Sequence, residues 1–89
     1  MTIQQRACAG TLESSDVYVE LSPSDSGIQI ELDSVVLDQF GDSIRQSVAE
    51  VLEENGVRSA RISLVDRGAL DCVIRARVET AVLRGKGVC

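Results

Sequence analysis

Apolar and polar residues alternate in two short segments of the N-terminal half of the chain. In residues 17–21, and again in residues 28–33, every second side chain is apolar. A period of two is typical of a strand that buries one face. Residues 22–27 between them contain Ser, Pro, Asp and Gly, which favour a turn. We therefore expect two strands joined as an antiparallel hairpin.

The spacing of apolar residues changes after residue 35 to three or four, which predicts a helix over about residues 35–54. Asn55-Gly56 follows, and both residues tolerate the left-handed conformation that ends many helices. The apolar stripe of this helix consists of Leu37, Phe40, Ile44, Val48, Val51 and Leu52.

The C-terminal third contains one clear strand and one ambiguous segment. Residues 60–64 alternate and predict a strand. In residues 70–84 two patterns compete. A strand face would hold Leu70, Cys72, Ile74, Ala76 and Val78, and a helical stripe would hold Leu70, Val73, Ile74, Val78, Ala81 and Val82. We favour a strand to about Val78, then a short helix to Leu83, with residues 85–89 as a flexible tail.

These elements predict an α+β fold in a single domain spanning residues 1–89. The expected architecture has two layers, an antiparallel sheet of about four strands and one long helix across a face of the sheet. A chain of 89 residues has room for one such domain.

Composition excludes several functional classes. The formal charge of −5 and the pI near 4.5 argue against a nucleic-acid-binding surface. The chain has no His, which removes the commonest general base and zinc ligand. No segment reaches the roughly 20 apolar residues of a membrane span or resembles a secretory signal. Three widely spaced Cys residues favour reduced thiols, so we expect a cytoplasmic protein with no membrane partner.

Arginines are concentrated near the C-terminus. If residues 60–78 form a hairpin, Arg61, Arg75 and Arg77 share one polar face. Like charges opposed on a sheet are unfavourable. Either acidic residues of the first hairpin, such as Glu20 and Glu31, interleave with them, or the face binds a phosphate or an acidic partner.

The segment Ala9-Gly10-Thr11-Leu12-Glu13-Ser14-Ser15-Asp16 is the best candidate for chemistry. Ser-Ser-Asp is also ordinary turn chemistry, because these side chains hydrogen-bond to nearby backbone. Flanking acids such as Glu13 and Asp16 can steer docking onto basic partners, or can simply aid solubility.

This segment resembles the N-terminal signature of the acyl carrier protein, or gamma subunit, of citrate lyase. Two further segments resemble the same family in the same order. They are Phe40-Gly41-Asp42-Ser43-Ile44-Arg45 and Gly68-Ala69-Leu70-Asp71-Cys72-Val73-Ile74-Arg75-Ala76-Arg77. Together the three segments extend over nearly the whole chain.

The resemblance implies that Ser14 carries a covalent prosthetic group, 2'-(5''-phosphoribosyl)-3'-dephospho-CoA, linked through a phosphodiester. Ser15 is the neighbouring alternative. The thiol of the group would hold acetyl and citryl thioesters while citrate is cleaved to acetate and oxaloacetate. The implied partners are the alpha (acyl transferase) and beta (citryl lyase) subunits of citrate lyase and a prosthetic-group transferase. The carrier would be non-catalytic alone, and no metal site is expected.

Two alternative functions remain, and a second serine and an enzyme are weaker candidates. The carrier subunit of malonate decarboxylase resembles that of citrate lyase in its prosthetic group, and a plain interaction module would carry no group at all. Ser43, in Gly41-Asp42-Ser43-Ile44, resembles the site of ordinary fatty-acid carriers. That site opens a helix that follows another helix, so a Ser43 inside a helix after two strands does not fit. An enzyme using Asp66, Asp71 and Glu79 has little support, because their spacing defines no shared site.

Overall fold

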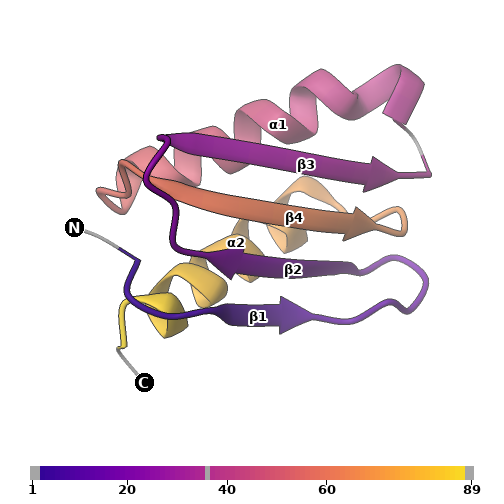
Figure 1. Cartoon of the computed structure of the whole chain (residues 1–89). Coiled ribbons are helices and arrows are strands. Elements are labelled where there is room, and N and C mark those ends of the chain that lie inside the picture. Colours follow the sequence, from indigo (N-terminus) through magenta and orange to yellow (C-terminus); the bar gives the residue numbers. More distant parts are fainter. Residues whose placement is uncertain (1–2, 36, 88–89) are drawn as a thin grey trace.

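Four strands form one mixed sheet, and two helices lie together on one face of it (Figure 1). The computed structural model describes residues 3–35 and 37–87. The elements in chain order are β1 (Ala7–Gly10), β2 (Val17–Ser22), β3 (Ile28–Ser34), α1 (Leu37–Glu54), β4 (Ala60–Asp66) and α2 (Asp71–Gly85). The predicted two-layer α+β class and the long helix are confirmed.

The strand order is β1-β2-β4-β3, with β3 parallel to β4 and the other neighbours antiparallel. The predicted hairpin of β2 and β3, and with it the wholly antiparallel sheet, is wrong. β4 lies between those two strands, because α1 connects β3 to β4 as a crossover, which makes the two strands parallel. Alternation in β2 and β3 reports which face is buried, and carries no information about which strand is the neighbour.

The predicted strand at residues 70–78 is also wrong, because this segment is the first half of α2. The buried residues of α2 follow the helical pattern: Ile74, Val78, Ala81, Val82 and Gly85. Cys72 and Ala76, which a strand would have buried, are exposed. The fourth strand is instead β1, whose four residues are too few to show a pattern.

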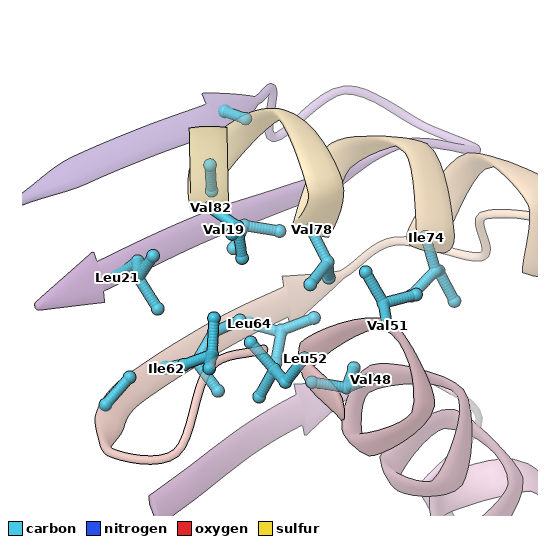
Figure 2. Close-up of a cluster of buried hydrophobic side chains, with 14 of the residues drawn as sticks. Val19, Leu21, Val48, Val51, Leu52, Ile62, Leu64, Ile74, Val78 and Val82 are labelled. Atoms are coloured by element: carbon cyan, nitrogen blue, oxygen red, sulfur yellow. The ribbon is translucent and has the colours of Figure 1, made fainter. Parts of the chain in front are cut away.

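The core lies between the sheet and both helices (Figure 2). The inward positions of β2 and β4 alternate as the sequence predicts, and they meet the apolar stripes of α1 and α2. The fully buried large side chains are Leu21, Leu52, Ile62, Leu64, Ile74, Val17, Val19, Val48, Val78, Val82 and Asp66. All but Asp66 are aliphatic, and Asp66 is therefore the exception that needs an explanation.

Charged side chains connect the two helices. Arg75 pairs with Glu50 of α1 and with Asp71 one turn earlier on α2, where Nε lies 2.9 Å from Oδ2. The Ser47 hydroxyl of α1 also donates to Asp71. These contacts favour a helical segment at residues 71–75, since Asp71 and Arg75 are neighbours only in a helix.

The two ends of the described chain meet at one edge of the domain. Gly85, where the sequence predicts the tail to begin, is the last residue of α2 and is buried. Its carbonyl accepts hydrogen bonds from the backbone N–H groups of Gln4 at 2.9 Å and Gln5 at 3.2 Å. Residues 88–89 of the predicted tail lie outside the described residues.

The helical assignment of α2 predicts opposite effects for two neighbouring positions. Ile74→Ala should lower the free energy of unfolding by about 2–5 kcal/mol, because it leaves a cavity in the core. Ala76→Lys should change it by no more than about 0.5 kcal/mol, because residue 76 faces solvent. Urea unfolding followed by circular dichroism measures both values. A comparable loss in Ala76→Lys would support the strand instead.

Candidate functional site

Ser14 lies in the connection between β1 and β2, residues 11–16, at the tip of a tight turn. The backbone N–H of Asp16 donates to the carbonyl of Glu13 at 3.2 Å, which makes Ser14 and Ser15 the two central residues. Ser15 has a φ of 65° and is the one described non-glycine residue with a positive φ. A positive φ at the second central position alone is the pattern of a type II turn.

Ser14 is the less constrained of the two serines. Both side chains are exposed. The backbone N–H of Ser15 donates to the carbonyl of Arg67 at 2.9 Å, which ties this side of the turn to the loop after β4. Within residues 3–35 and 37–87, neither the N–H nor the hydroxyl of Ser14 makes a hydrogen bond. The Ser14 hydroxyl is therefore presented to solvent from a fixed backbone.

Asp16 holds the turn in place. Its carboxylate accepts hydrogen bonds from the Thr11 hydroxyl at 2.7 Å and the Val17 N–H at 2.8 Å. Two guanidinium nitrogens of Arg77 donate to it at 3.0 and 3.2 Å. The bonds from Thr11, Arg77 and Val17 lower the pKa of Asp16 from 3.8 to about 2. This carboxylate is an anchor between the loop and α2, and its oxygens are already occupied.

The buried carboxylate of Asp66 holds the loop between β4 and α2. It is 1% exposed, and its Oδ1 accepts the backbone N–H groups of Gly68 at 3.2 Å and Ala69 at 2.9 Å. The Ser34 hydroxyl donates to Oδ2 at 2.7 Å. A buried carboxylate is tolerated when its lone pairs are satisfied in this way. The loop it shapes contains Arg67, whose N–H donates to the Asp16 carbonyl at 2.9 Å.

Gly10 is required where β1 enters the turn. Its φ is +89°, and a Cβ at this position would lie 1.8 Å from the carbonyl oxygen of Val17. No other residue fits without moving that backbone. Gly10, Thr11, Ser15 and Asp16 therefore have structural roles, and Ser14 is the exposed residue that they position.

No described side chain hydrogen-bonds to the Ser14 hydroxyl. Asp16 is paired and has a depressed pKa, and the chain contains no His. The three carboxylates named from the sequence have separate environments: Asp66 binds its own loop, Asp71 binds Ser47 and Arg75, and Glu79 is exposed on α2. Within the described ranges, no group of three or more His, Cys, Asp or Glu is placed to hold a metal ion. The arrangement presents the Ser14 hydroxyl to solvent without a bonded base among the described residues.

The sequence did not reveal that Thr11 and Arg77 are the partners of Asp16, or that the serine turn hydrogen-bonds to the loop at Arg67. It placed Arg61, Arg75 and Arg77 on one strand face, but in the structure they separate. Arg61 on β4 donates to Gln29, Arg75 lies between the helices, and Arg77 binds Asp16. Asp16 is thus not a free acidic residue that steers docking. The competing helical stripe at residues 70–82 was the signal that could have placed Arg77 on a helix.

Ser43, the weaker candidate, lies on the first half of α1 and is exposed. It follows a strand rather than a helix, as expected from the sequence. Ser14 lies in the β1–β2 connection and Ser43 lies on α1, so the two serines belong to different elements.

The chain is similar along most of its length to known acyl carriers. The family model described as "ACP: Malonate decarboxylase delta subunit (MdcD)" matches residues 4–85. The citrate lyase acyl carrier protein of Vibrio cholerae is 54% identical over 85 residues, covering 94% of this chain and 87% of the relative. That of Streptococcus mutans is 51% identical, covering 99% of this chain and 87% of the relative.

This chain belongs to the citrate lyase acyl carrier protein family. Proteins of this kind generally carry a covalent prosthetic group. The family and its carrier role, inferred above from three segments, are confirmed.

A solved structure shares the fold. A chain in the crystal structure of a Pseudomonas malonate decarboxylase hetero-tetramer in complex with malonate superimposes with a TM-score of 0.74 at 26% identity. The match covers 94% of this chain and 87% of that chain. The carrier fold is therefore found in a multi-subunit assembly.

Neither helix in the described part of the chain is long and apolar enough to cross a membrane.

The Asp16 anchor predicts a distinct acid response. The pKa of Asp16 is lower in the folded state than in the unfolded chain, so its stabilisation is complete above about pH 4 and is lost as the pH falls towards 2. Asp16→Asn should lower the free energy of unfolding by about 1–3 kcal/mol at neutral pH, because the variant loses hydrogen bonds to a charged group. Urea unfolding at pH 7 and pH 2.5 measures the free energy of unfolding of wild type and variant, and the difference between the two proteins should be smaller at pH 2.5. An equal difference at both would contradict the assignment.

Proposed function

We propose that the chain is the acyl carrier subunit of a citrate lyase and carries its prosthetic group on Ser14. The observation that carries the proposal is an exposed serine hydroxyl, unbonded within the described residues, on a turn held by Asp16 and Arg67. The relatives that share about half of the sequence are named as this subunit.

The residues around Ser14 fit a bulky phosphodiester-linked group such as 2'-(5''-phosphoribosyl)-3'-dephospho-CoA. Ser14 is at the outer side of its turn, so a substituent on its oxygen extends into solvent. Arg67 is an exposed cation in the adjoining loop and can offset the charge of the phosphodiester. When bound, the group supplies a thiol that holds acetyl and citryl units as thioesters.

The work of this chain is attachment and positioning, and it is not itself a catalyst in this proposal. A tethered thiol is kept at a local concentration in the millimolar range, so acyl groups need not be released between active sites. The reacting residues belong to the alpha (acyl transferase) and beta (citryl lyase) subunits, and a transferase attaches the group. Such a complex would operate in the cytoplasm, where the free Cys8 and Cys72 stay reduced.

A carrier of malonate decarboxylase is the second candidate, favoured by the matching family description and the Pseudomonas structure. The identities of 51–54% to citrate lyase carriers, against 26% to that structure, favour citrate lyase. Reconstitution with the catalytic subunits of each enzyme separates them. Cleavage of citrate supports the proposal, and decarboxylation of malonate alone overturns it.

Intact-mass spectrometry tests the attachment site. The protein co-expressed with its transferase should gain one adduct of the mass of phosphoribosyl-dephospho-CoA, and Ser14→Ala should abolish the gain, because its oxygen is the attachment point. Circular dichroism should show that Ser14→Ala is folded.

The control at the neighbouring position is Ser15→Gly. Glycine removes the hydroxyl and accepts the positive φ of 65° without strain, which alanine would not. Ser15→Gly should retain the adduct. If Ser15→Gly loses it while Ser14→Ala keeps it, the attachment site is Ser15.

A further inference from the structure

An apolar pocket of about 340 Å3 opens between the first turns of α1 and α2. Phe40 and Ile44 line it from α1, and Leu70 and Ile74 line it from the start of α2. The volume is near the lower end of that of small-molecule sites, which hold roughly 300–1,000 Å3. The pocket is large enough for a flat base or a nucleoside.

The pocket adjoins the serine turn. The carbonyl of Arg67 accepts the Ser15 N–H at 2.9 Å, and the next residue, Gly68, lines the pocket. One residue spans at most about 3.6 Å. The wall of the pocket at Gly68 is therefore about one residue away from Arg67, to which the serine turn is hydrogen-bonded.

Large apolar side chains are left exposed at this end of the sheet. Phe40 is 53% exposed and Leu70 is 70% exposed, and neither is needed by the core. Leu12, beside the turn, and Val35, whose N–H donates to the Asp66 carbonyl at 3.3 Å, belong to the same end. These account for four of the six exposed large apolar side chains among the described residues. Several exposed apolar side chains at one end of a domain indicate a ligand or partner surface.

We propose that this pocket binds the adenine base of the prosthetic group attached to Ser14. This inference rests on the proposed function. In that group the adenosine is next to the phosphoribosyl link, so the base is within reach, while the pantetheine extends from the other side. Phe40 offers an aromatic face on which a base can stack. Ser43 also lines the pocket, and its exposed hydroxyl can hydrogen-bond to the edge of the base.

Binding the base would fix the root of the arm and leave its thiol free. Because the tether holds the base at a local concentration in the millimolar range, an affinity in the same range is enough to populate the bound form. The adenine base can therefore occupy the pocket without a deep or tight site, which agrees with the open pocket between the helices.

Titration of the unmodified protein tests the pocket without relying on attachment. 15N-labelled protein is titrated with dephospho-coenzyme A and, separately, with 4'-phosphopantetheine, which lacks the nucleoside. Dephospho-coenzyme A should shift the amides of residues 40–44 and 68–71 saturably, and 4'-phosphopantetheine should not. Equal shifts by both probes, or none by either, would overturn the proposal; the second result would leave the pocket to a partner subunit.

Surface variants identify the stacking residue. Phe40→Ala should weaken the affinity for dephospho-coenzyme A by roughly tenfold or more. The matched control is Leu83→Ala, which removes an apolar side chain of 40% exposure elsewhere on α2 and should leave the affinity unchanged. Both positions are exposed, so neither variant should unfold the domain. An unchanged affinity in Phe40→Ala would contradict the proposal.

The modified protein provides the final measurement. Nuclear Overhauser contacts should connect the adenine protons to the Phe40 ring and the Leu70 methyl groups. If mass spectrometry finds the adduct on Ser14 but these contacts are absent, the pocket assignment fails while the carrier function stands. If no adduct forms, the proposed function fails and the titration still reports on the pocket.

Discussion

Two hydrogen bonds between the β1–β2 turn and the β4–α2 loop hold the exposed serine turn of this protein in place. The Ser15 N–H donates to Arg67, and the Arg67 N–H donates to Asp16. Each loop is also held by its own carboxylate, Asp16 on the outside and Asp66 in the interior. Because both carboxylates are engaged, the two loops are held together as one platform. The Ser14 side chain makes none of these hydrogen bonds.

The platform explains why the surrounding segment has its particular composition. Gly10 allows the close approach to Val17, Thr11 and Asp16 hydrogen-bond to each other, and Ser15 adopts a left-handed conformation. Each choice is unremarkable by itself and typical of turns. The turn interpretation and the attachment interpretation of Ser-Ser-Asp are therefore compatible, since the turn is what exposes Ser14.

Much of the fold could be predicted from the sequence, because periodicity reports burial. The inward faces of β2 and β4 follow the alternation of apolar residues. The predicted stripe of α1 is buried from Ile44 onward, whereas Phe40 is exposed. Strand neighbours could not be predicted, since β3 pairs with β4 only as a result of the crossover through α1. The segment at residues 70–78 fits both periods, and contacts of Arg75 and Arg77 with distant acids decide for the helix. The candidate serine came from resemblance, whereas its anchors Arg77 and Arg67 required the structure.

The meeting of Gln4 and Gln5 with the Gly85 carbonyl has a practical consequence. The segment before β1 and the C-terminal end of α2 lie at the end of the domain opposite the β1–β2 turn (Figure 1). A purification tag or a fluorescent label placed at this end of the domain would be remote from Ser14. Immobilisation of the domain on a sensor surface through this opposite end should leave the Ser14 hydroxyl exposed.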